Sequence, residues 1–232
     1  MRDYARLDRD RPRRTGVPEV ILAEGKTVDH LIAMLQALHA RGLGALVSRP
    51  TPVQLRALER ARKDGLPVRR LAGGRLVRLE GPLEVAYRGG RVALVAAGTS
   101  DVPVAEEARA VLEELGIRTV TAYDVGVAGL HRLLTAVRRL ERSAPVLYLA
   151  FAGREGALPT VLAGLVRAPV VGVPTSVGYG RGGRGESALN AMLQSCAPVA
   201  VVNIDAAVPA ALFAAHGFAR AGGAPRRTPR RR

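Results

Sequence analysis

The sequence predicts an α/β protein in which a small N-terminal α/β domain precedes a doubly wound, mostly parallel sheet of five strands with helices on both faces. Three observations support this prediction. Beyond residue 90, five apolar runs alternate with glycine-containing loops and helical segments. The apolar runs lack the alternation of half-exposed strands, as expected for parallel strands that helices cover on both faces. Gly89 and Gly90 separate this part of the chain from shorter elements before it.

Short runs of Val, Leu and Ala mark the five expected strands of the second part, at residues 92–97, 119–123, 146–152, 170–173 and 199–204. Apolar residues at helical spacing mark the helices between them, at residues 104–115, 130–140, 160–166 and 186–195. The apolar stretch 197–215 contains Asn203, Asp205 and Pro209, so it predicts a strand followed by a helix and not a membrane span.

The first ninety residues predict a smaller α/β unit, with strands at residues 19–23, 44–48, 68–71 and 75–79. Thr27 and Thr51 are suited to cap the two helices of this unit. Gly42 and Gly44 are suited to end the first helix, and Gly65 the second. We therefore expect an N-terminal domain at 1–88, a second domain at 89–219 and a basic, disordered tail at 220–232.

The net charge of +15 raises the question of nucleic-acid binding. Five arginines of this excess lie in the tail at 225–232, and aromatic residues, which stack on unpaired bases, make up only 3% of the chain. Nucleic acid is therefore not the expected primary partner. The single cysteine excludes an intramolecular disulfide, and the polar first fourteen residues do not resemble a signal peptide. We expect a cytoplasmic protein without a membrane segment.

Ligands of doubly wound sheets bind outside the carboxyl ends of the strands. The sequence places small and polar residues at each of these ends, in the loops 97–103, 123–132, 152–159, 174–184 and 203–205. Polar, glycine-rich loops that meet at one sheet edge predict an anionic ligand with several polar groups. In the first loop we expect Ser100 or Asp101 to cap the next helix, whose dipole Glu106 and Glu107 would complement.

Three features of the chain have both a functional and an ordinary structural interpretation. Cys196 stands at a predicted helix end just before the last strand, where a lone cysteine is most often a small core residue but can also be a nucleophile. Asn203 and Asp205 could orient the helix that bears Cys196, or could cap the final helix. A polar cluster near the start could lie close to a ligand or form a solvated loop, and its members are Glu19, Gly25, Lys26 and Thr27.

Seven motifs along the chain resemble the LarB family, and in order they are LDRDRPRRTGVPEV, EGKT, AAGTSDVPVAEEA, YDVGVAGLHRLL, AGREGALPTVLAGL, VPTSVGYG and LNAMLQSCAPVAVVNID. The resemblance covers nearly the whole chain except the tail. The second domain is also similar to the class I phosphoribosylaminoimidazole carboxylase (PurE) family, which implies a flavodoxin-like, PurE-like sheet.

The resemblance implies a pyridinium-3,5-biscarboxylic acid mononucleotide synthase, the enzyme of the first step of nickel-pincer nucleotide cofactor biosynthesis. Such an enzyme carboxylates the pyridinium ring of nicotinic acid adenine dinucleotide with CO2 or bicarbonate and hydrolyses its phosphoanhydride. The products are pyridinium-3,5-biscarboxylic acid mononucleotide and AMP. Both resembled families also imply a homo-oligomer.

The family's reactive cysteine falls on Cys196 and its acidic partner on Glu155, which makes them the expected nucleophile and base. A closed, apolar loop around Glu155 would raise its pKa, although the residue could instead pair with Arg154 on the surface. Substrate contacts are expected from Thr99, Ser100, Asp101, Asp124, Gly126, His131, Arg132, Gly153, Thr175, Ser176, Tyr179 and Gly180. His131 has the equally ordinary interpretation of a helix-surface residue.

The sequence holds no cysteine cluster or closely spaced histidine pair for a transition metal, so no tightly bound cofactor is expected. Mg2+ could accompany the substrate pyrophosphate. One alternative is a PurE-type carboxyaminoimidazole ribonucleotide mutase, which Ala157 argues against because it stands where the purine family has a catalytic histidine. Another is a non-catalytic nucleotide- or nucleic-acid-binding module. The segments 181–186 and 206–211 depart from the LarB pattern.

Overall fold

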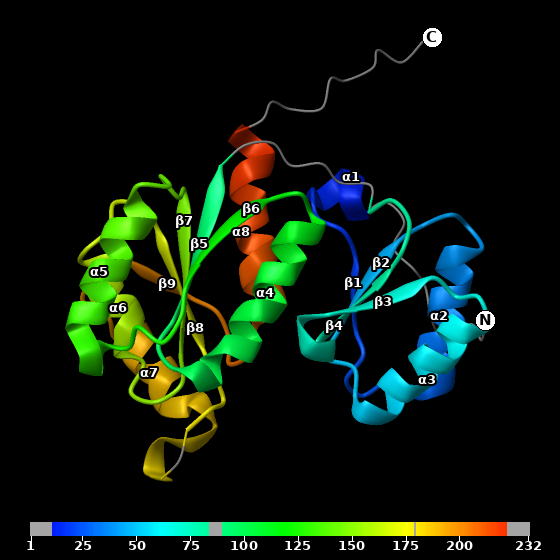
Figure 1. Ribbon diagram of the computed structural model, residues 1–232, viewed down its shortest axis with the longest axis horizontal. Helices are drawn as coiled ribbons and strands as arrows, with labels where there is room; N and C mark the ends of the chain where they lie inside the picture. The colour runs from blue at the N-terminus through cyan, green and yellow to red at the C-terminus, as the bar shows by residue number, and fades with distance from the viewer. Residues whose placement is uncertain (1–10, 84–89, 179, 222–232) are drawn as a thin grey trace.

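The computed structural model describes residues 11–83, 90–178 and 180–221 and places them in two α/β units (Figure 1). The N-terminal unit has a sheet of four strands and the second unit a sheet of five. The expected domain boundary between residues 88 and 89 lies within the undescribed residues 84–89. Of the tail expected at 220–232, the first two residues belong to the last helix, which ends at Ala221, and the rest lies outside the described residues. Among the described residues, no helix has the length and apolar character that crossing a bilayer requires.

The five-stranded sheet confirms the predicted doubly wound, parallel architecture. Its strands are β5 (Arg91–Ala96), β6 (Arg118–Ala122), β7 (Leu147–Ala152), β8 (Val170–Pro174) and β9 (Val199–Val201). They are all parallel, in the order β6-β5-β7-β8-β9. The direction of winding therefore reverses between β5 and β7, which is the point where flavodoxin-like sheets bind ligands.

The two edge strands differ from the prediction of burial on both faces. β5, β7 and β8 are buried, whereas the residues of β6 and β9 are mostly half-buried or exposed. β9 also ends at Val201, three residues before the expected end, because the chain turns where the Ala206 N–H donates to the Asn203 carbonyl. Apolar composition alone does not distinguish a central strand from an edge strand, which has a neighbour on one side only.

Helices cover both faces of this sheet (Figure 1). One face carries α4 (Val102–Glu114) and α8 (Ala207–Ala221). The other face carries α5 (Leu130–Glu141), α6 (Ala157–Ala163) and α7 (Glu186–Leu193). Alternate residues of β7 serve the two layers: Leu149 and Phe151 pack toward α4 and α8, and Tyr148 and Ala150 toward α5 to α7. Three 3-10 turns occupy the loops at the carboxyl edge, at Thr99–Asp101, Val127–Gly129 and Gly180–Gly185.

The N-terminal unit has the four strands expected from the sequence, β1 (Val20–Leu22), β2 (Ala45–Ser48), β3 (Val68–Leu71) and β4 (Leu76–Leu79), in the order β1-β2-β4-β3. A 3-10 turn at Ala72–Gly74 joins β3 and β4. The helices α2 (Val28–His39) and α3 (Pro52–Lys63) cover one face of the sheet, and the Thr27 and Thr51 side chains cap them as predicted. A short helix that the sequence did not indicate, α1 (Arg11–Thr15), precedes β1.

The other face of the N-terminal sheet packs against α4, which therefore belongs to the cores of both units. The Glu107 carboxylate is fully buried there, and it accepts hydrogen bonds from the Ser48 hydroxyl (2.6 Å) and from Arg75 Nε (2.9 Å). Glu114, two turns later on α4, pairs with Arg69 and Arg78 at 3.0 Å each. These bonds fix the two units to one another.

The expectation that Glu106 and Glu107 complement the dipole of this helix is wrong. The helix begins at Val102, so both glutamates lie beyond its first turn. Glu106 instead contacts Arg109 at 3.2 Å and accepts a hydrogen bond from the Tyr123 hydroxyl at 2.5 Å. The dipole effect is confined to the first turn, so neither carboxylate benefits from it appreciably.

The burial of Glu107 predicts a pH-dependent contribution to stability. Burial raises the pKa of Glu107, and this effect outweighs the opposing influence of Ser48 and Arg75. Because the folded state binds this proton more tightly than the unfolded state, the contribution is full below the ordinary pKa of about 4.3 and is lost as pH rises through the raised value. A glutamine amide at this position could still bond to Ser48 and Arg75 but could not ionise. We therefore expect Glu107→Gln to gain stability relative to wild type as pH rises from about 4 to 7.

Urea unfolding of both proteins across this pH range measures the effect. Glu113→Gln on the same helix is the control, since Glu113 is 46% exposed and its pair with Arg109 is a surface ion pair. The free energy of unfolding of Glu107→Gln minus that of wild type should grow as pH rises. If this difference stays constant or shrinks, the raised pKa of Glu107 is contradicted.

Candidate functional site

A cavity of about 840 Å3 lies at the carboxyl edge of the five-stranded sheet, where the direction of winding reverses. Its lining comes from four loops that follow β5, β6, β7 and β8, with residues drawn from 97–101, 126–128, 152–156 and 177–178. The sequence predicted that these loops meet at one edge, and the structure confirms it. Most of the lining is glycine, alanine and valine, so the backbone forms much of the surface.

Asp101 is the most buried of the polar side chains that line the cavity. It is 5% exposed, and its two carboxylate oxygens accept hydrogen bonds from the Thr175 hydroxyl (2.5 Å) and from the Gly98 N–H (2.8 Å). Burial raises the pKa of Asp101, although both hydrogen bonds act in the opposite direction, and the carboxylates of Glu155 and Asp205 raise it further. This carboxylate fixes the first loop to the fourth.

The structure corrects one expectation about this loop. Asp101 occupies the N-cap position of α4, but its side chain makes no cap hydrogen bond, because the carboxylate turns back to Gly98. Ser100 is not the N-cap residue. The Val102 N–H, the first of α4, bonds to the Thr99 carbonyl, and Pro103 has no N–H, so the N–H groups suited to receive an anion are those that begin the preceding 3-10 turn, Thr99–Asp101.

Close backbone approach forces two glycines in the loop that follows β7. A Cβ on Gly153 would lie 2.2 Å from the Val177 carbonyl oxygen, so this position brings the third loop against the fourth. Gly156 has φ +67°, and a Cβ there would lie 2.6 Å from the Ala188 carbonyl oxygen on α7. The left-handed conformation of Gly156 also starts α6 three residues before the predicted position.

Glu155 lies between these two glycines and lines the cavity. Its side chain is exposed in the single chain, so the expected closed, apolar loop around it is not present there. Arg154, beside it, is also exposed and also lines the cavity. The loop thus offers a carboxylate and a guanidinium group at the rim, above the buried Asp101.

Several predicted substrate contacts lie outside this cavity. Arg132 Nη1 lies 2.5 Å from Asp124 Oδ2, so these two exposed side chains bind each other across the loop after β6. His131 and Thr99 are exposed and do not line the cavity, and Gly180 lies beyond it in a 3-10 turn. Their roles stay predictions.

Thr175 and Ser176 do not line the cavity, but their hydrogen bonds hold residues next to it. Thr175 is fully buried under Asp101, and the Ser176 N–H donates to Asp205 Oδ1 at 2.9 Å. Gly126 and Gly153 line the cavity as predicted, and Tyr179 lies outside the described residues. Ala128 and Val177 also line it but were not predicted, because such residues carry no chemical signal of their own and contribute backbone surface only after the loops converge.

Cys196 is exposed and lies at the other end of the sheet. It follows α7 and comes three residues before β9, whose amino end it therefore adjoins, whereas Glu155 follows the carboxyl end of β7. Ser195 Oγ accepts hydrogen bonds from the Thr160 hydroxyl (2.9 Å) and from the Ala197 N–H (3.1 Å), which fixes this turn against α6. A five-residue strand spans roughly 16 Å, so one chain does not bring Cys196 and Glu155 together.

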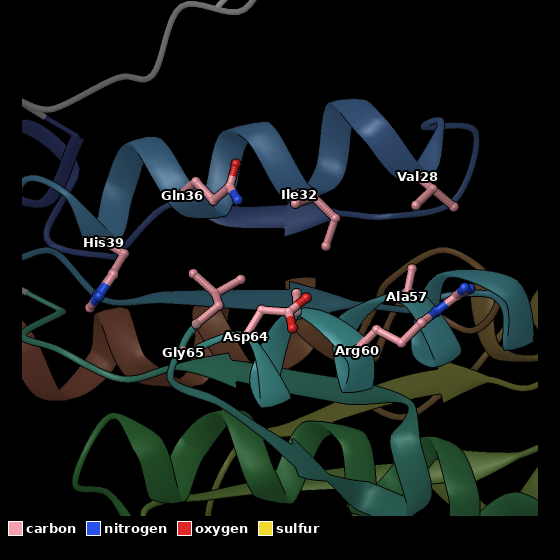
Figure 2. A pocket seen from close by; sticks show the side chains of 10 residues that line it. Val28, Ile32, Gln36, His39, Ala57, Arg60, Asp64 and Gly65 are labelled. Atoms are coloured by element: carbon pink, nitrogen blue, oxygen red, sulfur yellow. The ribbon is translucent and has the colours of Figure 1, made fainter.

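Another hollow, of about 530 Å3, lies on the N-terminal unit between α2 and α3. Figure 2 shows the Ile32 side chain of α2 pointing toward α3, on the side where Arg60 and the following helix-end residue Asp64 lie. None of the residues predicted for the site lines this hollow, and it lies on the side of the N-terminal unit away from the five-stranded sheet (Figure 1).

Comparison with known proteins supplies two family matches that together span most of the chain. Residues 91–224 match the family model described as AIR carboxylase, and residues 1–72 match the one described as LarB/PurE-like N-terminal domain. An uncharacterized protein of Methanocaldococcus jannaschii is 40% identical over 214 residues, which cover 90% of this chain and 82% of that protein.

Other relatives match the second unit only, and they are named as mutases. The N5-carboxyaminoimidazole ribonucleotide mutase of Pyrococcus horikoshii is 33% identical over 129 residues, 53% of this chain and 69% of that enzyme. The crystal structure of Treponema denticola PurE is similar with a TM-score of 0.47 and 24% identity, over 56% of this chain and 80% of that one.

The close contact at Gly156 predicts a matched pair of stability effects. Gly156→Ala introduces a Cβ 2.6 Å from the Ala188 carbonyl oxygen, so we expect a loss of about 3 kcal/mol in the free energy of unfolding. Gly180→Ala is the control, because Gly180 has a similar φ of +70° with no heavy atom within 4 Å of the added Cβ, and should lose only ~1 kcal/mol. Chemical denaturation measures both, and equal losses would show that α6 and α7 are not closely packed there.

Proposed function

The chain belongs to the AIR carboxylase family and carries a LarB/PurE-like N-terminal domain, and from this premise we propose that it carboxylates the pyridinium ring of nicotinic acid adenine dinucleotide and hydrolyses its phosphoanhydride. The family membership makes it a PurE-related enzyme of the carboxylase or mutase type. The observation that supports the particular reaction is the cavity at the carboxyl edge, which Ser100 and Asp101 of the 3-10 turn before α4 line together with Glu155 at the rim. The products would be pyridinium-3,5-biscarboxylic acid mononucleotide and AMP.

The chemistry needs a nucleophile, because a pyridinium ring and CO2 are both electrophiles. The Cys196 thiolate adds to the ring carbon para to the nitrogen and forms a neutral dihydropyridine, which is an enamine. The free carbon meta to the nitrogen then attacks CO2 and forms the new carbon–carbon bond. A base removes the proton from that carbon, and expulsion of the thiolate restores the aromatic pyridinium. Attack of water on the phosphoanhydride separates the mononucleotide from AMP.

The cavity residues suit the remaining roles. Glu155 is the proposed base, since it lines the cavity and is exposed to a substrate that enters from solvent. The N–H groups that begin the 3-10 turn Thr99–Asp101, just before α4, would bind a substrate phosphate, and Asp101 would keep the Gly98 loop in place for this contact. A magnesium ion on the pyrophosphate is part of the proposal and would enter with the substrate.

The separation of Cys196 from Glu155 means that a complete site requires two copies of the chain. We therefore propose a homo-oligomer in which Cys196 of one subunit enters the cavity of another. Cys196 is exposed, and Leu193 beside it is 64% exposed, so this turn presents an apolar surface that a second subunit would cover. The same contact would enclose Glu155, which is exposed in the single chain.

Mass spectrometry tests the reaction directly. Purified protein is incubated with nicotinic acid adenine dinucleotide, Mg2+ and 13C-bicarbonate, and we expect a labelled dicarboxylated mononucleotide together with AMP. Cys196→Ser should abolish labelling, and Glu155→Gln should lower its rate by about 100-fold or more. No label and an intact dinucleotide would overturn the proposal.

Mixed assemblies test the sharing of the site between subunits. Cys196→Ser and Glu155→Gln chains, each inactive alone, are co-expressed with different tags and purified through both. We expect between about a quarter and about a half of wild-type activity: one site in four combines an intact Glu155 with an intact Cys196 in a random equal mixture, and purification through both tags removes the inactive assemblies of a single chain type. If both residues act within one chain, no mixture regains activity.

A second candidate function is the N5-carboxyaminoimidazole ribonucleotide mutase reaction, because relatives 30–34% identical to the second unit bear this name. Ala157, the first residue of α6, stands where the resembled purine enzymes have a catalytic histidine. The same preparation is assayed with N5-carboxyaminoimidazole ribonucleotide. If wild type and Cys196→Ser both convert this substrate, the mutase reaction is favoured.

A further inference from the structure

The two units enclose a second cavity, of about 410 Å3, that the chemistry above does not use. We call it the interdomain cleft. One wall comes from α1, β1 and the end of β2, and the other from α4, from the turn after β9 and from α8. Its volume is within the range of small-molecule sites. It also includes Arg11 and Val20 from the N-terminal motif that the sequence singled out and the proposed reaction leaves without a role.

The lining of the cleft combines apolar walls with a few polar groups. Val20 and Leu22 face the cleft from one side, and Val208, Pro209 and Leu212 from the other. Such facing apolar walls suit a flat ring that enters between them. A carboxylate or phosphate alone would leave the apolar side chains of these walls in contact with water. The lining therefore fits a ligand that has both a ring and an anionic group.

The polar groups of the cleft are arranged for the anionic and hydroxyl parts of such a ligand. Arg49 reaches the cleft near the surface, where it contacts Glu24 at 3.0 Å. Arg11 Nε is buried and has no hydrogen-bond partner among the described residues. Both oxygens of the buried Glu107 are occupied by Ser48 and Arg75, so this carboxylate is already compensated. Arg11 Nε thus lacks a partner, whereas Arg49 would bind an anion beside or in place of Glu24.

The turn after β9 contributes groups of a different kind. Asn203 is exposed at the cleft; its amide oxygen already accepts the Ile204 N–H at 2.8 Å, and its amide NH2 group can donate to a ligand. Asp205 is half-buried, and the Ser176 N–H donates to its Oδ1. The second oxygen of Asp205 can accept a hydrogen bond from a ligand hydroxyl, which is how acidic residues bind ribose in nucleotide sites.

The cleft and the catalytic cavity are neighbours on the same edge of the sheet. Asp101 of the cavity binds the Thr175 hydroxyl, and the N–H of the next residue, Ser176, binds Asp205 of the cleft. Two consecutive residues therefore connect a side chain of the cavity, Asp101, with a side chain of the cleft, Asp205. A ligand with two ring systems joined by a flexible link could occupy both.

We propose that the interdomain cleft binds the adenylate half of the dinucleotide while its pyridinium half occupies the catalytic cavity; this rests on the proposed function for the identity of the substrate. The adenine ring would enter between the apolar walls, with Asn203 on its polar edge. Asp205 would accept from the ribose, and Arg49 and Arg11 would offset the phosphate charge. The N-terminal domain would thereby confer preference for a dinucleotide over the mononucleotide alone.

Binding of AMP to the full chain tests the cleft without any turnover. Leu22→Trp fills the cleft from an exposed position, since Leu22 is 47% exposed, and Arg49→Gln removes a charge from its wall. By isothermal titration calorimetry we expect each variant to weaken AMP binding about tenfold or more. Val53→Trp is the matched control: Val53 is 54% exposed on α3, away from the cleft, and AMP binding should stay within about twofold of wild type.

Steady-state kinetics with the dinucleotide separates the two proposals. Leu22→Trp should raise KM for the dinucleotide by about tenfold and leave kcat within about twofold, because the reacting ring lies elsewhere. Unchanged AMP binding and unchanged KM in both Leu22→Trp and Arg49→Gln would overturn the cleft assignment, even if labelled product forms. If AMP binds and both variants weaken it, but wild type never forms labelled product, the adenylate assignment stands and the proposed reaction falls.

Discussion

The buried Glu107 carboxylate holds the two units of this protein in one arrangement. Its oxygens bind Ser48 and Arg75 of the N-terminal unit, while its own helix, α4, packs on the five-stranded sheet. A carboxylate removed from water is tolerated only where partners compensate it, so the two units must keep this contact. The N-terminus of the same helix faces the catalytic cavity, and its flank faces the interdomain cleft. One contact thus fixes the relation between both spaces.

Small residues create the cavity at the carboxyl edge, and hydrogen bonds connect the loops around it. Gly153 and Gly156 allow backbones to approach within distances that any side chain would prevent. Asp101 then joins the first loop to the fourth through Thr175, and Asp205 joins the fourth loop to the turn after β9 through Ser176. The loops are therefore cross-linked by carboxylates whose burial has a free-energy cost, which is typical of a site that must be held in a defined shape.

The position of Cys196 changes how the proposed chemistry is understood. A helix that follows a strand of a parallel sheet returns to the amino edge, so a residue between α7 and β9 lies far from the loops at the carboxyl edge. A nucleophile at that end can serve a cavity at the other end only in a neighbouring subunit. Exposure of Cys196 and Leu193 in the single chain is consistent with this arrangement, since each is a side chain that assembly would cover.

The sequence by itself determined most of the strands and helices, the Thr27 and Thr51 caps and the edge at which the loops meet, because periodicity, these caps and the rule for parallel strands depend on neighbours within a few residues. It did not indicate the short helix α1, and the cap it predicted for α4 is absent. It also indicated the types of residue present in the site. Tertiary structure alone decided which of them meet. Ser48 and Glu107 are 59 residues apart, and Asp101 and Thr175 are 74 apart, so their bonds depend on how layers and loops pack. For the same reason the sequence pattern that names Cys196 and Glu155 as partners does not reveal that the sheet separates them, because spacing along the chain carries no measure of distance across a fold.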